Sequence, residues 1–376
     1  LTERYTMSSE KGTDALTVTL NGYIGKIVEY ILHAGGDILK FAGDAILAVW
    51  KVKQRSDLKH AISQAAKCSL AIQDKCDNQE TDVGVKLRVK IAISAGKIFA
   101  TFVGNEEVRH FVMAGRPIKE VNDAEKYCEA GLVVLSPNGM ELSDKENIIT
   151  DPLSERFGLV RHLRREPRKE WHEYVDLPMG LKFTKHADRN IRMCLGIRSD
   201  PIRERVVRKY ISPVVQRKLD DDQPLKYLSE MRQCSILFIN LAFDLSERDR
   251  QFHEKQCANM QQSFNIVHGN ITDRQGSLNK IFMFDKGCTF LVIFGLPGDK
   301  HEQEPAHALQ AAWNINQELR ETIPTLSLAS FGVTTGPVFC GVIGHAERHE
   351  YTVIGQKVNL AARLMMHYPN HVSCDF

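Results

Sequence analysis

The sequence contains an internal repeat. Residues 94–115 (SAGKIFATFVGNEEVRHFVMAG) resemble residues 334–355 (TTGPVFCGVIGHAERHEYTVIG). Four landmarks keep a constant separation of 240 positions: Gly96 and Gly336, Phe99 and Phe339, Gly104 and Gly344, Gly115 and Gly355. Further upstream, residues 40–50 match residues 283–295, with Phe41 against Phe284 at a separation of 243. Self-similarity over this length predicts two copies of one domain, with a small insertion between the landmarks.

Each copy shows a similar mixture of helix and strand patterns. In the first copy, the hydrophobic spacing predicts helices over 20–32, 58–76 and 117–128, a hairpin over 38–50, and strands over 87–94 and 108–114. In the second copy it predicts strands over 235–241, 326–333 and 350–354, a hairpin over 280–294, and helices over 248–267, 304–318 and 357–366. Strands interleaved with helices around one hairpin indicate an α+β fold, with helices on one face of a mostly antiparallel sheet.

The region between the copies differs in composition. Residues 156–174 are basic, residues 220–224 are acidic and typical of a turn, and a helix is predicted over 203–219. A solvated linker explains these charge runs more simply than nucleic-acid binding does. We therefore expect a first domain over 1–165, a connector over 166–229 and a second domain over 230–376.

Composition excludes several classes of protein. The net charge of the 376 residues is +2, which gives no overall attraction to nucleic acid or to an anionic membrane. No apolar run approaches the roughly 20 residues of a membrane-spanning helix. Nine cysteines without a CxxC pair favour reduced thiols over a disulfide framework or a zinc site. The reduced thiols favour a location in the cytoplasm, with organelles as an alternative. Because the chain begins at Leu1 rather than methionine, we expect a fragment.

The two copies differ in their polar residues in a complementary way. The hairpin turn of the first copy carries Asp44, and the alignment places Gly287 at that position in the second. The predicted helix after the last landmark of the second copy carries Asn359 and Arg363, which lie on one helix face. The first copy has a lysine and an aspartate instead. This reciprocal loss favours one site built across a pseudo-twofold interface, with a degenerate mirror site.

The residues retained suit chemistry on a phosphorylated nucleotide. A carboxylate such as Asp44 can hold Mg²⁺, which prefers a few carboxylates together with phosphate oxygens and water. A guanidinium such as Arg363 can neutralise charge on a transferring phosphoryl group. Each residue alone is more often a turn aspartate or a surface arginine, so the pair carries the hypothesis.

Three segments resemble a known family. They are KFAGDA (residues 40–45), NKIFMFDKGCTFLVIFG (279–295) and YTVIGQKVNLAAR (351–363). They are similar to the tandem catalytic halves of class III nucleotide cyclases, and most closely to the bicarbonate-responsive soluble adenylyl cyclases. The resemblance implies two ferredoxin-like, palm-type domains that pack as a pseudo-twofold heterodimer within one chain. It also implies conversion of ATP to 3′,5′-cyclic AMP and pyrophosphate by attack of the ribose 3′-oxygen on the α-phosphate.

The resemblance assigns roles to eight residues at this site. Asp44 would be one of two aspartates that hold a pair of Mg²⁺, Mn²⁺ or Ca²⁺ ions, and Lys90 would contact the triphosphate. Asn359 would orient the ribose, and Arg363 would stabilise the α-phosphate in the transition state. The residues that would read the adenine edge are Lys280 and Thr352, helped by Val353 and Val358. Lysine and threonine suit the ring acceptor and amino donor of adenine, so this pair favours ATP over GTP.

Two departures from the family pattern bear on activity. The second metal aspartate is expected on a strand before Leu1, and the corresponding strand of the second copy has Asn240. We therefore expect the fragment alone to be inactive. In the mirror site, the residues expected around bicarbonate, an activator in the family, are Lys40, Met113, Met283 and Phe284, but Asn122 stands where an arginine is expected. A catalytically inactive regulatory module that binds nucleotide or bicarbonate remains the alternative to a cyclase.

Overall fold

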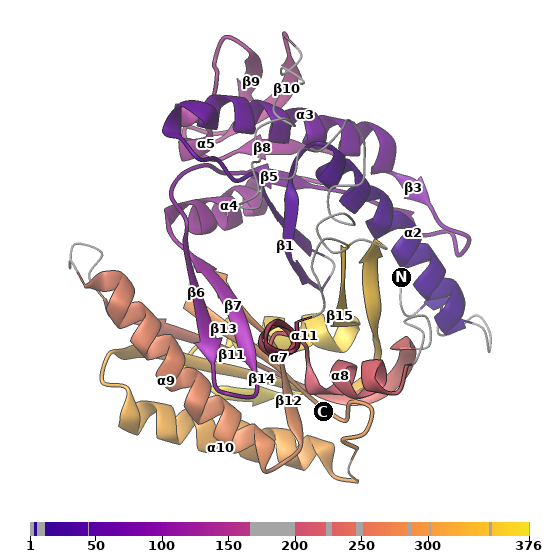
Figure 1. The fold of residues 1–376 in the computed structure, drawn as a ribbon, viewed down its shortest axis with the longest axis vertical. Helices are drawn as coiled ribbons and strands as arrows, with labels where there is room; N and C mark the ends of the chain where they lie inside the picture. The colour runs from indigo at the N-terminus through magenta and orange to yellow at the C-terminus, as the bar shows by residue number, and fades with distance from the viewer. Residues whose placement is uncertain are drawn as a thin grey trace.

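The computed structural model describes residues 4–5, 12–43, 45–165, 200–222, 228–245, 251–284, 287–300, 302–345 and 348–375. The chain forms two halves that lie against each other, the first indigo to magenta and the second orange to yellow in Figure 1. Both halves combine helices with largely antiparallel strands, which confirms the predicted α+β class.

The first half begins with the long helix α2 (Gly12–His33), whose buried positions follow helical spacing from Leu16 to Ile31. The other elements, in chain order, are β1 (Asp37–Ala42), β2 (Ala45–Val49), η1 (Arg55–Asp57), α3 (Leu58–Cys76), β3 (Gln79–Glu80), β4 (Lys86–Leu87), β5 (Ile91–Ile93), β6 (Phe99–Gly104), β7 (Arg109–Ala114), α4 (Arg116–Tyr127), β8 (Val133–Leu135), α5 (Pro137–Leu142), β9 (Ile148–Pro152) and β10 (Gly158–Leu163). The strands form the β1–β2, β3–β4 and β6–β7 hairpins and a four-stranded sheet in the order β5-β8-β10-β9.

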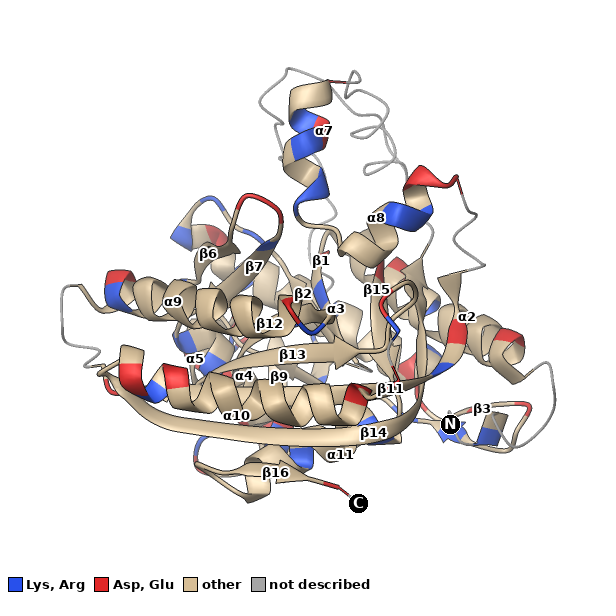
Figure 2. Cartoon of the chain, turned by 90° about the horizontal axis from the view of Figure 1, so that it is seen from below, with Lys and Arg blue, Asp and Glu red and all other residues tan. Residues whose placement is uncertain are grey.

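The second half is built on one six-stranded sheet. Its elements are β11 (Glu230–Phe243), α9 (Phe252–Thr272), β12 (Gly276–Phe284), β13 (Gly287–Phe294), α10 (Glu304–Thr322), β14 (Leu326–His345), β15 (Arg348–Ile354), α11 (Gln356–His367) and β16 (Val372–Cys374). The strand order is β12-β13-β11-β14-β15, and β16 pairs with β14 in parallel. Helices α9 and α10 pack on one face of this sheet (Figures 1 and 2).

The central strand β11 is apolar on both faces. Leu237, Ile239 and Leu241 join the core beneath α9 and α10. The alternate residues Ile236 and Phe238 join the core beneath α11. Because successive side chains of a strand point to opposite faces, the consecutive apolar residues 236–239 are what a central strand covered on both faces requires, and Asn240 is a buried polar exception.

Each half packs a long hairpin into the hydrophobic core of the other half. Val103 and Val112 of the β6–β7 hairpin are buried in the core of the second half. Phe339 and Ile343 of β14 are buried in the core of the first half. Since Val103 and Ile343 are related by the 240-residue repeat, the exchange follows a pseudo-twofold axis.

Two amide side chains fasten this exchange at equivalent positions. Asn21 on α2 donates to the Val342 carbonyl over 3.2 Å and accepts from the Gly344 amide over 3.1 Å. Gln261 on α9 donates to the carbonyl of Gly104 over 2.8 Å and accepts from the amide of Gly104 over 3.1 Å. Both amide residues and both glycines are 240 positions apart. The landmark glycines therefore mark the places where each half binds the other.

The hairpin alignment made from the sequence is wrong by a few residues. Each hairpin has an irregularity in register directly before a lysine, between Ile38 and Lys40 in β1 and between Leu278 and Lys280 in β12. Lys40 and Lys280 are therefore equivalent, again 240 positions apart, and the second hairpin is longer beyond its lysine. The position of the bulge is a better guide to equivalent residues than the match between Phe41 and Phe284, because a bulge sets which residues pair across the hairpin.

The same register changes the counterpart of Asp44. When Lys40 is matched to Lys280, the pair Ala42–Ala45 corresponds to the pair Phe282–Thr289. Asp44 then has no single counterpart, because the longer second hairpin has extra residues here, among them Asp285 and Lys286. The second hairpin therefore also has an acid in its turn sequence, and the clear difference between the copies is at Asn359 and Arg363.

The helix predicted over 203–219 is two helices. They are α7 (Pro201–Arg208) and α8 (Pro213–Asp220), and α7, which contains three arginines, projects from the body of the molecule (Figure 2). Pro213 lacks an amide proton and cannot continue a helix, but it suits the first turn of α8.

Among the described residues, no helix combines the length and apolar character that crossing a bilayer requires. The eight cysteines of these residues are free thiols.

Candidate active site at the interface of the two halves

Lys280 and Thr352 lie together in a buried position between the halves. Each is only 1% exposed, and the Lys280 Nζ donates to Thr352 Oγ1 over 3.0 Å. Lys280 also donates to the carbonyl of Phe41 on β1, in the first half. The pair predicted to read the adenine edge therefore lies against the hairpin that leads to Asp44.

A glutamate that the sequence analysis did not single out completes this cluster. Glu350 Oε1 lies 3.0 Å from the Lys280 Nζ, and Glu350 Oε2 accepts from the Phe41 amide over 3.0 Å. Burial lowers the pKa of Lys280, and the Glu350 carboxylate opposes that shift. The available signal was the period-two spacing of Glu350 and Thr352, which places both side chains on one face of β15.

The two valines assigned to the base pocket are core residues. Val353 is 1% exposed and Val358 is 6% exposed, and both belong to the cluster that also contains Ala361 and Met365 of α11. They therefore pack α11 against β15.

Asn359 and Arg363 lie on the exposed side of α11. The helix begins at Gln356, directly after Gly355, and runs for twelve residues, as α4 does after Gly115 in the first half. Arg363 lines a hollow of about 510 Å³ together with Leu364, Met366, His367 and Tyr368. The guanidinium is thus accessible to a ligand.

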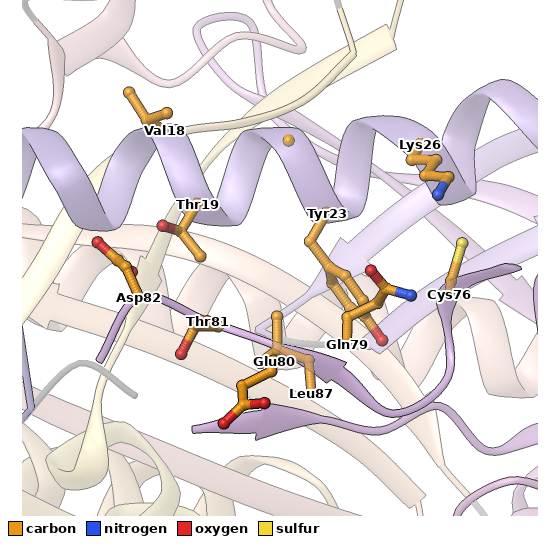
Figure 3. A pocket seen from close by; sticks show the side chains of 11 residues that line it. Val18, Thr19, Tyr23, Lys26, Cys76, Gln79, Glu80, Thr81, Asp82 and Leu87 are labelled. Carbon is orange, nitrogen blue, oxygen red and sulfur yellow. The ribbon is translucent and has the colours of Figure 1, made fainter. Parts of the chain in front are cut away.

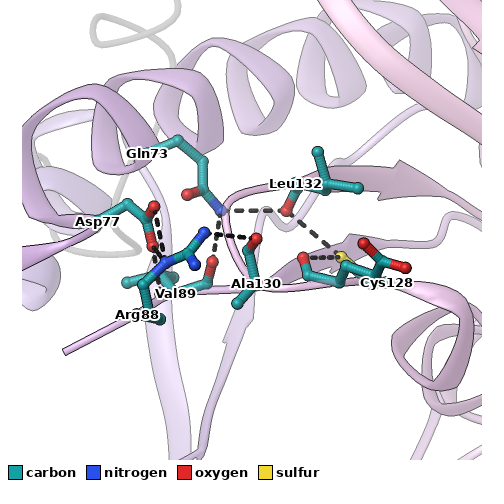
Figure 4. Close-up of polar contacts among 8 residues, drawn as sticks. Gln73, Asp77, Arg88, Val89, Cys128, Ala130 and Leu132 are labelled. Atoms are coloured by element: carbon teal, nitrogen blue, oxygen red, sulfur yellow. Dashed lines mark hydrogen bonds and ion pairs between the residues drawn. The ribbon is translucent and has the colours of Figure 1, made fainter. Parts of the chain in front are cut away.

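Lys90 directly precedes β5 and forms an ion pair with Glu125 of α4. The backbone before Lys90 is fixed by polar contacts shown in Figure 4. Asp77 accepts from Arg88 Nε over 3.0 Å and from the Val89 amide over 2.9 Å, and Gln73 Nε2 donates to the Val89 carbonyl over 3.0 Å. Lys90 is well anchored, but its ammonium is directed to Glu125 rather than to the Lys280 cluster.

Asp44, the predicted metal ligand, lies outside the described residues. The structure describes its neighbours Gly43 and Ala45, and β1 up to Ala42. The described residues contain no group of three or more acidic, histidine or cysteine side chains that could hold a metal ion. The metal site therefore stays a prediction.

The mirror site is occupied by Lys40. Its Nζ donates to the carbonyl of Ile281 on β12 over 2.7 Å and to the carbonyl of Phe111 on β7 over 3.1 Å. The ammonium also lies 5.4 Å from the ring centroid of Phe282, within cation–π range. Burial lowers the pKa of Lys40 to about 8; the Glu350 carboxylate opposes this shift, and the Lys280 charge adds to it.

The other residues predicted around bicarbonate lie on the strands that hold Lys40. Met113 is on β7, two residues from Phe111, while Met283 and Phe284 are at the end of β12. Asn122 on α4 has a buried amide nitrogen with no hydrogen-bond partner in the structure. An unsatisfied buried donor is costly, and an added acceptor would relieve that cost.

A separate hollow lies away from this interface. It has a volume of about 350 Å³ and lies between α2 and the β3–β4 hairpin (Figure 3). Its lining includes Thr19, Tyr23, Glu80 and Asp82, and none of the residues predicted from the sequence. It therefore plays no part in the site described above.

Comparison with known proteins decides the family. The family model of the adenylate and guanylate cyclase catalytic domain matches residues 3–157 and 227–368. This chain belongs to that family. The two matched segments correspond to the two halves, so the cyclase fold and the resemblance predicted from the sequence are confirmed.

Individual relatives agree with this cyclase assignment. The chain is 39% identical over 381 residues to adenylate cyclase type 10 of Oryctolagus cuniculus, and 38% identical over 381 residues to that of Homo sapiens. Each alignment covers 100% of this chain and 23% of the relative, so the chain spans about a quarter of the length of these cyclases. A solved bacterial light-regulated adenylyl cyclase is 20% identical, at a TM-score of 0.36, with 47% of this chain and 52% of that chain covered. The family assignment rests on the family match.

Proposed function

We propose that the protein is an adenylyl cyclase that converts ATP to 3′,5′-cyclic AMP and pyrophosphate at the interface of its halves. The observation that carries the proposal is the buried Lys280–Thr352 pair, held against β1 of the other half. The relatives named adenylate cyclase support the reaction class. We also propose the domain limits 1–165 and 230–376, with 166–229 as connector.

The base-reading step follows from the donors and acceptors present. A protonated lysine only donates, so Lys280 suits the ring-nitrogen acceptor of adenine and opposes the ring N–H of guanine. The Thr352 hydroxyl can accept from the adenine amino group. Val353 on β15 and Val358 on α11 would support the pocket from the core side, since both are buried in the cluster between these elements.

The ribose and phosphates would lie along the exposed side of α11. In that position Asn359 would orient the ribose, and Arg363 would neutralise charge that develops on the α-phosphate during attack by the 3′-oxygen. Lys90 would reach the triphosphate only by leaving Glu125, since the two now form an ion pair.

Asp44 would hold Mg²⁺ or Mn²⁺, or Ca²⁺, in agreement with the oxygen ligands that these ions prefer. A bound divalent ion would supply charge neutralisation at the phosphates. Phe41, three residues earlier in the sequence, is held by Lys280 and Glu350, which supports a metal site close to the base-reading pair.

The test is a cyclic AMP assay on the full-length protein with ATP and Mn²⁺ or Mg²⁺. We expect cyclic AMP from ATP, little cyclic GMP from GTP, and loss of metal-dependent activity in Asp44→Asn. ATP-analogue binding without turnover by the full-length protein would instead favour the alternative, an inactive regulatory pseudo-cyclase.

We further propose bicarbonate as an activator that binds the mirror site around Lys40. The Lys40 ammonium and the unpartnered amide nitrogen of Asn122 support an anion there, although asparagine supplies no charge. We expect bicarbonate to raise kcat in the same assay and Lys40→Met to abolish the increase. An unchanged rate across bicarbonate concentrations would exclude this regulation.

A further inference from the structure

The residue directly before Lys90 has both of its backbone groups fixed by hydrogen bonds. The amide of Val89 donates to Asp77 Oδ1 over 2.9 Å, and its carbonyl accepts from Gln73 Nε2 over 3.0 Å (Figure 4). The same carbonyl also accepts from the Gly131 amide over 2.6 Å. Because Lys90 is the next residue, these three hydrogen bonds fix the point from which its side chain extends.

Asp77 lies where helix geometry disfavours a carboxylate. It is the C-cap of α3, and the helix dipole places partial negative charge at that end. Arg88 compensates this charge, since its Nε donates to both carboxylate oxygens over 3.0 and 3.1 Å and its Nη2 donates to the Ala130 carbonyl over 2.7 Å. Burial would raise the pKa of Asp77, but the hydrogen bonds from Arg88 and the Val89 amide lower it. A charged carboxylate therefore joins the end of α3 to Arg88 and Val89.

The second half fixes the equivalent amide in a different way. Ala329 stands 240 positions after Val89, and its amide donates to Asn370 Oδ1 over 3.1 Å. The next residue, Ser330, is fully buried, and its Oγ accepts from the Asn370 amide over 2.9 Å. In the first half the next residue is Lys90, whose side chain is 44% exposed. The carboxylate–arginine pair is thus found in the half where the following side chain extends into solvent.

The ion pair of Lys90 with Glu125 can be exchanged for a ligand. The two side chains are 44% and 49% exposed, and exposed ion pairs contribute little to stability. A triphosphate offers more negative charge and more acceptor oxygens than one carboxylate, so it can replace Glu125. Because a lysine side chain is long and flexible, the position of its backbone decides where the ammonium can bind without further loss of entropy.

We infer that Asp77 is a positioning residue for triphosphate binding, which acts on Lys90 through the backbone of Val89. A charge-assisted network at this point holds the start of the lysine side chain more firmly than a neutral amide would. The inference rests on the proposed function, in which Lys90 contacts the triphosphate. It adds to that function a residue at the end of α3 that acts through another side chain.

The experiment compares the binding of two nucleotides that differ only in their phosphates, 2′,3′-dideoxy-ATP and 2′,3′-dideoxy-AMP. Isothermal titration with Mn²⁺ is carried out on the full-length protein as wild type, Asp77→Ala, Asp77→Asn, Lys90→Met and the double variant Asp77→Ala/Lys90→Met. The matched control is Asp151→Ala, which removes another carboxylate of the same half that accepts from an arginine Nε, that of Arg161 over 2.6 Å. Hydrogen–deuterium exchange of the peptide containing Val89 is measured without nucleotide.

In Lys90→Met we expect dideoxy-ATP affinity to fall roughly tenfold, the magnitude of one charge-assisted hydrogen bond, with dideoxy-AMP affinity unchanged. Asp77→Ala should lower dideoxy-ATP affinity by roughly three- to tenfold, and the double variant should match Lys90→Met, because the two residues are coupled. Asp77→Asn should have a smaller effect, because its amide oxygen can still accept from Val89. Exchange at Val89 should be faster in Asp77→Ala, and Asp151→Ala should behave as wild type throughout.

The outcomes separate the inference from the proposed function. Equal losses for both nucleotides in Asp77→Ala, losses that add in the double variant, or unchanged exchange at Val89 would overturn the role of Asp77 and leave the proposed function standing. A wild-type protein that bound dideoxy-ATP no better than dideoxy-AMP would overturn the role of Lys90 and the inference with it. A wild-type protein that bound neither nucleotide would overturn the proposed function itself.

Discussion

Lys40 and Lys280 occupy equivalent places in two copies of one hairpin, yet their surroundings differ. Lys280 is held by a carboxylate, a hydroxyl and a carbonyl, whereas Lys40 is held by two carbonyls beside an aromatic ring. The first environment places a carboxylate directly against the ammonium, and in the second the Glu350 carboxylate favours the charged form of Lys40 without contacting it in an ion pair. Divergence at single positions, Glu350 against His110 above all, can turn two symmetric clefts into a base-reading site and an anion site.

The sheets of the two halves show a second contrast. β14 runs unbroken from Leu326 to His345 and pairs with β11 over most of that length. The corresponding stretch of the first half is divided into β5 (Ile91–Ile93) and β6 (Phe99–Gly104). No strand among the described residues pairs with β5 or β6 as β11 pairs with β14. Pairing with the central strand β11 therefore keeps β14 continuous as one long strand.

The largest expected effect is on the rate of catalysis, and it should occur for a substitution on α11 but not at the equivalent position of α4. Arg363→Ala should lower kcat for cyclic AMP formation by about 10²–10³-fold, the usual cost of removing one donor to a developing charge. Folding should be unaffected because the side chain is exposed. The matched control is Asp123→Ala at the equivalent position of α4. Equal rates in wild type and Arg363→Ala would remove the guanidinium from the mechanism.

The two lysines are predicted to have different effects on nucleotide binding. Lys280→Met should weaken ATP-analogue binding by roughly 10–100-fold, the magnitude of one or two charge-assisted hydrogen bonds. Lys40→Met should leave it within about twofold, because Lys40 lies in the mirror site. Isothermal titration of both variants provides the measurement, and equal losses would mean that the clefts have not diverged.

Substitutions of the two interface amide residues, Asn21 and Gln261, should in contrast have similar effects on stability. Asn21→Ala and Gln261→Ala each remove two hydrogen bonds to backbone across the interface, at a cost of about 2 kcal/mol in the free energy of unfolding. Gln262→Ala, an exposed neighbour on α9, should change stability by less than about 0.5 kcal/mol. Chemical denaturation tests this, and a large effect in only one clamp variant would contradict symmetric fastening.

The smallest predicted effect, taken per pH unit, is the pH dependence of stability. The folded pKa of Lys40, about 8, lies below its ordinary value of 10.5, so between these pH values the unfolded chain holds a proton that the folded chain has released. Stability should therefore rise with pH across this window, by about 1 kcal/mol per pH unit. Lys40→Met should show a smaller rise than wild type in denaturation curves at pH 8–10.5. Identical slopes would mean that Lys40 stays charged in the folded protein.

The sequence predicted the repeat-related elements because glycine landmarks and apolar periodicity survive divergence. Gly104 and Gly344 are retained since a Cβ at either would lie within 2.5 Å of a backbone oxygen. The register of the β1–β2 and β12–β13 hairpins was missed because a bulge leaves no mark in residue type. The continuity of β14 was missed because pairing with β11 is a long-range property.

The candidate site was predicted in part. Lys280 and Thr352 are brought together as expected, and Arg363 lies exposed on α11. Lys90 is paired with Glu125, and Asp44 lies outside the described residues. Glu350 was missed because its role depends on the Phe41 backbone, more than 300 positions away in the sequence.

The most direct test of one active site in a duplicated fold is the number of nucleotides bound per chain. Titration of the full-length protein with 2′,3′-dideoxy-ATP and Mn²⁺ should give one site, abolished by Lys280→Met and retained in Lys40→Met. Two equivalent sites, or one site that is lost in Lys40→Met and kept in Lys280→Met, would contradict the assignment of base recognition to Lys280 and Thr352.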